Sequence, residues 1–272
     1  MNPVLGRVRS TNVPSSFNLC DLPPWVIASR EYNENPEPFE VQGVRRANRF
    51  LFAKLDTIDD PRARGEVFND YMSVKFYLHE LDTESDKARR SIKNSYLRFL
   101  RGWGVDSNSV EGAVLKGWVE SRIGIPPTFH KERIRGASHE DSMTYVTDRM
   151  RGSAFTNAIN SQLDVLYEFC QYELRRRGND RFFKLFRGTY DLSEHQVLET
   201  TGKREYVVKL NNLFSCTNDR ERAWEFGTTV WQITVPASKV FFFTDLLPNS
   251  ILKGEGEYIV IGGDYRVKQL LA

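Results

Sequence analysis

The stretch Lys253-Gly254-Glu255-Gly256-Glu257-Tyr258, followed directly by Ile259-Val260-Ile261, places two carboxylates at the start of a short apolar run. The length and β-branched residues of this run are typical of a buried strand. Residues i and i+2 of an extended chain face the same side, so we expect Glu255 and Glu257 to point into one space. The glycines at 254 and 256 give the backbone freedom to bend just before the strand.

Two like charges held close together are unfavourable unless a positive or reactive group lies between them. An active-site pair of carboxylates is one interpretation of this stretch, and a charged turn in solvent is the other. A Glu-x-Glu sequence is common, so the choice between the two depends on the rest of the chain.

Upstream of about residue 181, the chain shows helical patterns. Apolar residues recur at helical spacing over 44–55, 67–81, 92–103 and 110–123. A longer pattern over 153–177 ends in three arginines and Gly178, which suit the negative end of a helix and its stop. Near the N-terminus, Pro23-Pro24 suits a helix start, and we expect Trp25, Val26 and Ile27 to be packed against the body of the protein.

Downstream of residue 181, short apolar runs predict strands at 182–189, 206–210, 229–235, 240–243, 258–261 and 265–270. Asn218 is expected to cap a short helix over 219–226 that Gly227 ends. Helices followed by strands indicate an α+β fold, and the lack of long helices between the strands favours a mainly antiparallel sheet. We therefore expect a mainly helical half over 1–180 and a β-rich half over 181–272, in one compact unit.

Composition narrows the classes of function. The 272 residues carry a formal net charge of only +2, which gives no electrostatic case for a nucleic-acid partner. No apolar run of about 18 residues predicts a membrane span, and the first residues lack the apolar core of a secretory signal. Cys20, Cys170 and Cys216 are far apart and the four histidines are scattered, so we expect reduced cytoplasmic thiols and no metal site.

Two further motifs fall at strand ends. In Leu185-Phe186-Arg187-Gly188-Thr189, an arginine next to a glycine can present a rigid fork to phosphate or carboxylate. In Leu213-Phe214-Ser215-Cys216-Thr217-Asn218, the hydroxyls of Ser215 and Thr217 face one side, which also fits an edge strand followed by a cap. The chain contains neither a Gly-x-Gly-x-x-Gly nor a Walker motif.

The order Arg187, Ser215, Glu255-x-Glu257 resembles the arginine–serine–glutamate class of mono-ADP-ribosyltransferases, which use NAD without a Rossmann fingerprint. Together with residues 18–29 and the total length, the three motifs look like the dinitrogenase reductase ADP-ribosyltransferase family, over nearly the whole chain. The sequence Ser215-Cys216-Thr217 departs from the Ser-Thr-Ser form common in the class, although Thr217 keeps a hydroxyl. The resemblance implies a β-sandwich ADP-ribosyltransferase core and NAD as co-substrate.

The resemblance also implies roles for the motif residues. Glu257 stabilises the oxocarbenium-like ribose and bonds its 2′-hydroxyl. Glu255 binds the acceptor guanidinium and accepts its proton. Ser215 is catalytic too, because it holds the nicotinamide ribose and orients Glu257. Arg187 binds the pyrophosphate or a neighbouring ribose oxygen, and the backbone of Gly188 binds the nicotinamide carboxamide. Thr217 also contacts NAD. One aromatic residue covers the nicotinamide ring, and the candidates are Phe226, Trp224 and Tyr190.

The expected acceptor is an arginine of dinitrogenase reductase, the nitrogenase iron protein, whose modification blocks docking and reversibly stops nitrogen fixation. The family also implies activation by a PII signalling protein. The helical half is the expected place for target and regulator recognition. A basic segment over 129–139, with Lys131, Arg133 and Arg135, is either a solvated face or a contact for an acidic partner.

Three other functions fit parts of the pattern. A non-enzymatic regulator that binds NAD or a partner needs none of the reactive residues, so the intact Arg, Ser and Glu pair disfavours it. A secreted arginine-directed toxin is disfavoured by the missing signal and disulfides. A retaining glycosidase would use the closely spaced carboxylates but would leave the arginine and serine motifs without a purpose.

Overall fold

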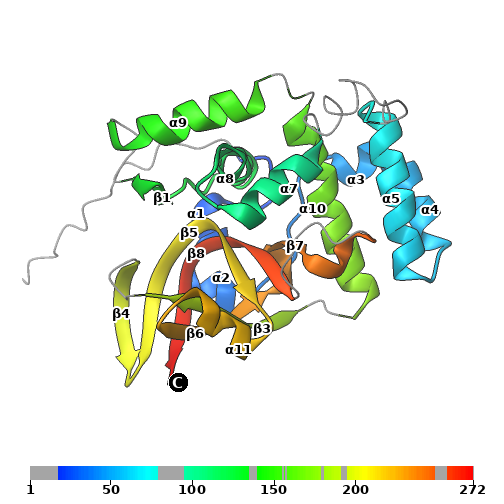
Figure 1. Ribbon diagram of the computed structural model, residues 1–272. Coiled ribbons are helices and arrows are strands. Elements are labelled where there is room, and N and C mark those ends of the chain that lie inside the picture. The colour runs from blue at the N-terminus through cyan, green and yellow to red at the C-terminus, as the bar shows by residue number, and fades with distance from the viewer. Residues whose placement is uncertain are drawn as a thin grey trace, which may run out of the picture.

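In the computed structural model, helices come first along the chain and the main sheet comes last, as the sequence predicts (Figure 1). The structure describes residues 18–78, 95–134, 140–154, 156, 158–178, 181–190, 195–248 and 256–271. The helices are α1 (Pro24–Ile27), α2 (Arg30–Glu34), α3 (Val44–Ala47), α4 (Arg49–Asp56), α5 (Pro61–Lys75), α7 (Tyr96–Val105), α8 (Val110–Arg122), α9 (Glu140–Ser153), α10 (Ile159–Arg176) and α11 (Arg220–Ala223). The strands are β1 (Phe129–His130), β2 (Glu132–Arg133), β3 (Phe182–Thr189), β4 (Gln196–Gly202), β5 (Glu205–Thr217), β6 (Thr229–Pro236), β7 (Val240–Phe243) and β8 (Glu257–Leu270). Short 3-10 turns are η2 (Trp224–Phe226), η3 (Ala237–Lys239) and η4 (Thr244–Leu246).

The antiparallel sheet is confirmed. The six strands of the β-rich half are hydrogen bonded in the order β4-β5-β3-β6-β8-β7, with a further pairing of β5 to β8. All of these pairs are antiparallel. The β5–β8 pairing runs from Glu205 opposite Lys268 to Thr217 opposite Glu257, and it closes the strands into a ring with β3 and β6. The arrangement of this sheet as a two-layer sandwich stays a prediction.

Several predicted boundaries are wrong, for identifiable reasons. The runs 258–261 and 265–270 form one strand, β8, because a bulge in β5 between Leu210 and Leu213 lies opposite the interruption and pairing continues beyond it. The helix expected over 153–177 starts later than predicted, because residue 153 ends α9 and α10 begins only at Ile159. Asp219, not Asn218, caps α11, since its carboxylate accepts from the backbone N–H groups of Glu221 and Arg222. Trp25 is 75% exposed, so it is not packed, whereas Ile27 is fully buried.

The two halves share one apolar core, which includes Phe68 and Leu166 from the helices and Val208 and Ile261 from the sheet. The helix α10 lies between the strands and the helices α3, α4 and α5 (Figure 1). Its Gln171 donates from Nε2 to the carbonyl of Val240 in β7, at 2.8 Å. The division of functions between residues 1–180 and 181–272 stays a prediction. Within the described residues, no helix is long and apolar enough to cross a membrane.

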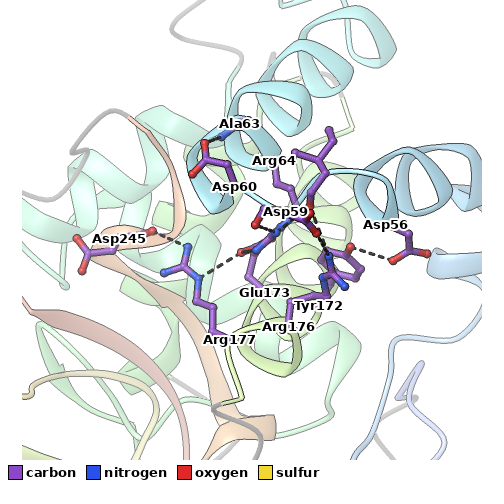
Figure 2. Close-up of polar contacts among 11 residues, drawn as sticks. Asp56, Asp59, Asp60, Ala63, Arg64, Tyr172, Glu173, Arg176, Arg177 and Asp245 are labelled. Carbon is purple, nitrogen blue, oxygen red and sulfur yellow. Dashed lines mark hydrogen bonds and ion pairs between the residues drawn. The ribbon is translucent and has the colours of Figure 1, made fainter.

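A buried ion pair fixes the C-terminal end of α10 (Figure 2). The carboxylate of Glu173, fully buried, accepts from Nη2 of Arg64 in α5 at 2.9 Å. The same guanidinium donates to the carbonyl oxygens of Ile58 and Asp59, so its buried donors are used. Next to this pair, Arg177 donates to Glu173 and to the carbonyl of Asp245 in η4. The network therefore anchors η4, the turn against which Glu257 lies.

Candidate active site

Glu257 is the first residue of β8, and both its backbone N–H and its backbone carbonyl are hydrogen bonded to one threonine. The N–H of Glu257 donates to Oγ1 of Thr244 at 3.0 Å, and that hydroxyl donates to the carbonyl of Glu257 at 3.2 Å. A hydroxyl has one proton and two lone pairs, so it can do both. Because the ion-pair network described above anchors η4, this arrangement fixes the start of β8.

The side chain of Glu257 contacts Ser215 across the β5–β8 pair. Thr217 is opposite Glu257 and Ser215 is opposite Ile259, so Ser215 and Glu257 face the same side. The hydroxyl of Ser215 lies 2.9 Å from Oε1 of Glu257, and it also accepts from the indole N–H of Trp103 at 2.8 Å. Burial raises the pKa of Glu257, against the lowering effect of the Ser215 hydrogen bond and of the Arg222 charge.

Arg187, on β3, reaches the same serine through its backbone. Nη1 of Arg187 donates to the carbonyl oxygen of Ser215 at 2.8 Å, and the guanidinium lies 5.8 Å from the centre of the Phe214 ring. The structure thus brings the predicted arginine, serine and second glutamate together, with Ser215 contacting the other two. A cation suited to phosphate and a half-buried carboxylate lie on either side of one serine.

Gly188 lies under the segment formed by α11 and η2. A Cβ added there would lie 2.1 Å from the carbonyl oxygen of Ala223 and 3.0 Å from Cβ of Phe226, so only glycine allows this close approach. Phe226 therefore lies beside Gly188, and 61% of this residue is exposed. Trp224 packs against the small cluster of Phe186, Ala223 and Val230. Of the three aromatic candidates, Phe226 is the one whose position beside Gly188 and exposure suit a ligand cover, since Tyr190 lies beyond the end of β3.

The turn before Glu257 needs its glycine. Gly256 has a φ of +70°, and a Cβ there would lie 2.1 Å from Oδ1 of Asn218. Thr217 is buried, and its hydroxyl accepts from the N–H of Asp219 at 3.1 Å, which matches the alternative interpretation of this motif as a cap. Glu255, the expected acceptor-binding residue, lies outside the described residues.

A pocket of about 750 Å³ extends from Arg187 and Ser215 toward the helical half. It is lined by Ser107, Asn108, Thr128, Phe129, Arg133, Ile134, Arg187, His195, Gln196, Lys209, Asn211, Leu213, Phe214 and Ser215. Its lining does not include Glu257, Gly188 or Phe226, so the pocket continues the site away from the carboxylate. Its size lies in the range of small-molecule sites.

Residues of the helical half form one wall of this pocket, which the sequence did not suggest. Asn211 of β5 accepts from the N–H of Thr128 at 2.9 Å and donates to the carbonyl of Phe129 at 2.8 Å. Lys116 of α8 is buried and donates to that carbonyl and to Asn108, both at 3.0 Å. Burial lowers the pKa of Lys116 to about 7. The β1–β2 hairpin is therefore anchored from both halves.

The predicted basic segment over 129–139 has mixed roles. Lys131 pairs with the carboxylate of Asp148 at 2.6 Å, and His130 contacts the same carboxylate at 3.0 Å. Arg133 lines the pocket, and Arg135 lies outside the described residues. Lys131 is thus engaged in an ion pair within the protein, and Arg133 lies at the pocket of the candidate site.

All three cysteines lie in the described part of the chain. Cys20, Cys170 and Cys216 are buried and free. Within the described residues, no group of three or more His, Cys, Asp or Glu side chains is placed to hold a metal ion.

Comparison with known proteins gives a clear relationship. The model of the dinitrogenase reductase ADP-ribosyltransferase family matches residues 17–269. The NAD(+)–dinitrogen-reductase ADP-D-ribosyltransferase of Rhodospirillum rubrum is 44% identical over 262 residues, which cover 93% of this chain and 94% of the relative. No solved structure matches the chain.

Proposed function

The chain belongs to the dinitrogenase reductase ADP-ribosyltransferase family, and on that premise we propose that it transfers ADP-ribose from NAD to an arginine of dinitrogenase reductase. The observation that carries the proposal is the arrangement around Ser215. Its hydroxyl lies 2.9 Å from Oε1 of Glu257, and its carbonyl lies 2.8 Å from Nη1 of Arg187. The reaction needs just such a carboxylate for the developing sugar cation beside a cation for phosphate.

In the proposed reaction the bond between the ribose C1′ and nicotinamide breaks, and a bond from C1′ to a guanidinium nitrogen forms. Glu257 stabilises the positive charge that develops on the ribose as neutral nicotinamide leaves. Glu255 accepts the proton that the guanidinium must lose, because a protonated guanidinium is a poor nucleophile. Ser215 orients Glu257 and holds the nicotinamide ribose.

The residues present fit NAD in two adjoining regions. We place the nicotinamide against the exposed side chain of Phe226, at the edge of the Gly188 backbone, with Arg187 at the pyrophosphate and Thr217 close to the same end of the site. The ADP part extends into the 750 Å³ pocket, where Arg133 and Lys209 supply positive charge and Phe129 supplies an aromatic surface. Binding of NAD then involves the helical half as well as the sheet.

The proposal includes the finer architecture. The strands β4, β5, β8 and β7 form one layer of a sandwich and the pair β3 and β6 forms the other. The closure of the ring supports this reading: β3 meets β5 only near Phe186 and Thr217, while β5 and β8 pair over their length. Target and PII recognition belong to the helical half, residues 1–180, and the setting is cytoplasmic, where a nitrogenase component is accessible.

The experiment mixes the protein with NAD labelled in its adenine and with purified dinitrogenase reductase, with and without a PII protein and ADP. We expect label on one arginine of the target, with more label when the PII protein and ADP are present. Thermal stabilisation by NAD without release of nicotinamide or transfer of label would instead indicate a non-enzymatic regulator. Label that appears equally on unrelated arginine-containing proteins would indicate a toxin-like specificity.

A further inference from the structure

Trp103 joins the helical half to the contact between Ser215 and Glu257. It belongs to α7 and is 2% exposed, and its indole nitrogen lies 2.8 Å from Oγ of Ser215, a residue 112 positions further along the chain. The same Oγ lies 2.9 Å from Oε1 of Glu257. A chain of two hydrogen bonds therefore runs from a tryptophan of the helices to the glutamate at the start of β8.

The direction of this chain follows from the chemistry of its members. The indole N–H of tryptophan only donates, so Oγ of Ser215 accepts from Trp103. The serine hydroxyl has a single proton, and an ionised carboxylate only accepts, so this proton points to Glu257. With Trp103 in place, the hydroxyl is held in the rotamer that serves the carboxylate. Without the indole N–H of Trp103, the Ser215 hydroxyl can rotate toward solvent or toward a ligand.

We propose that Trp103 is a positioning residue for ADP-ribose transfer, whose indole N–H fixes the Ser215 hydroxyl as a donor to Glu257. The chemical part of the inference rests on the proposed function, whereas the hydrogen-bond chain does not. A member of the helical half then contributes to the rate of the reaction and not only to recognition. Trp103 itself contacts no substrate; it acts through Ser215.

The inference predicts a change in the pH profile as well as in the rate. Within the described residues, the titratable groups that interact electrostatically with Glu257 are Arg222, from α11, and the buried thiol of Cys216, on β5. Burial raises the pKa of Glu257 and the Ser215 hydrogen bond lowers it. Loss of the Trp103 donor weakens that hydrogen bond, so the pKa of Glu257 rises further. Because activity needs the ionised carboxylate of Glu257, the variant should lose activity at a higher pH than the wild type when the solution is acidified.

A double-mutant cycle tests the inference. Trp103→Phe keeps an aromatic ring but removes the donor, and we expect kcat for transfer to fall about five- to tenfold, as for a loss of about 1 kcal/mol, with KM for NAD within twofold. In a Ser215→Ala background, Trp103→Phe should change kcat less than twofold, because Trp103 acts through the missing hydroxyl. The acid limb of the kcat profile should move to higher pH in the single variant.

The matched control is Trp118→Phe. Trp118 is a fully buried tryptophan of α8 whose Nε1 donates to Asp164, also at 2.8 Å. Its replacement should lower thermal stability by at least as much as Trp103→Phe without moving the acid limb. Equal loss of kcat from Trp103→Phe with and without Ser215, or an unmoved acid limb, would overturn the inference.

An NMR measurement separates failure of this inference from failure of the proposed function. With ¹⁵N-labelled protein, the indole N–H of Trp103 should shift on Ser215→Ala and should titrate together with Glu257, while that of Trp118 does neither. This result supports the hydrogen-bond chain even where no transfer activity is found. If the indole resonance of Trp103 changes neither on Ser215→Ala nor with the titration of Glu257, the hydrogen-bond chain is refuted even in an active enzyme.

Discussion

Arg187 donates from Nη1 to the carbonyl oxygen of Ser215, 2.8 Å away. The bond spans the gap between β3 and β5 at the place where these two strands pair through Phe186 and Thr217. A guanidinium presents five N–H donors in a fixed fork. We expect this side chain both to hold β5 in place and to contact the pyrophosphate of NAD.

Arg187→Lys should weaken NAD binding more than it affects folding. Lysine keeps the charge but cannot donate to the carbonyl and to phosphate in the fixed geometry of the fork. We expect KM for NAD to rise about 10- to 100-fold, which corresponds to about 1.5–3 kcal/mol for a hydrogen bond to a charged group. Steady-state kinetics with varied NAD measures this effect. Arg266→Lys, at a surface pair with Glu34, is the control and should leave KM unchanged.

Arg133→Ala tests the assignment of the pocket to the ADP part of NAD. Arg133 lies on β2, in the helical half, and lines the pocket remote from Glu257. We expect KM for NAD and the Ki of ADP-ribose to rise about 5- to 30-fold, with kcat within twofold, because this contact is as strong in the ground state as in the transition state. Arg62→Ala, at an exposed pair with Glu66 on α5, is the matched control. An unchanged KM in Arg133→Ala would remove the hairpin from the NAD site.

Gly188→Ala should damage both stability and activity. The new methyl group would lie 2.1 Å from the carbonyl oxygen of Ala223, a backbone atom that can move only if α11 and η2 move with it. We expect a loss of about 1–3 kcal/mol in the free energy of unfolding and a strong loss of transfer, since Phe226 moves with η2. Gly202→Ala is the control, because its nearest contact would be an ordinary 3.6 Å. Circular dichroism melts and label transfer on both variants measure the difference.

Glu168→Gln should stabilise the protein at alkaline pH and leave its stability unchanged near pH 4.5. Burial raises the pKa of Glu168 from 4.5 to about 7 in the folded protein, and its Oε1 accepts from the N–H of Val41 at 3.0 Å. The folded state therefore binds more protons than the unfolded state between these values, so stability falls as pH rises through this window. Glutamine keeps the acceptor without the charge.

The expected gain for Glu168→Gln at pH 8 is about 1–3 kcal/mol, seen as a rise in Tm of several degrees relative to the wild type. Glu66→Gln, at a surface position of α5, should show no such pH-dependent difference. A Glu168→Gln variant that is less stable than the wild type at pH 8 would mean that the carboxylate is held charged by its neighbours, Arg45 among them.

The sequence predicted the fold class from local patterns, and the family resemblance predicted that Ser215 orients Glu257. Apolar runs gave most strands, and alternation along an extended chain put Ser215 and Thr217 on one face; the β5–β8 register then places Glu257 opposite Thr217. It did not predict β4, whose residues are nearly all exposed and carry no apolar pattern. It also missed Trp103 and the β1–β2 hairpin, because their contacts with β5 join segments about 80 to 110 residues apart. The ligand contact of Gly188 stays a prediction, and the sequence did not show that Gly188 also makes room for α11 and η2.

The most direct test of the account is the release of nicotinamide from labelled NAD by Glu257→Gln, compared with Glu255→Gln and the wild type. Glutamine cannot supply the negative charge that stabilises the ribose cation, so Glu257→Gln should lose both NAD hydrolysis and transfer by at least about 100-fold while keeping its Tm within a few degrees. Glu255→Gln should lose transfer to arginine and keep measurable hydrolysis, because the cation can still form. Transfer by Glu257→Gln at the wild-type rate would contradict the assignment of Glu257 and, with it, the proposed mechanism.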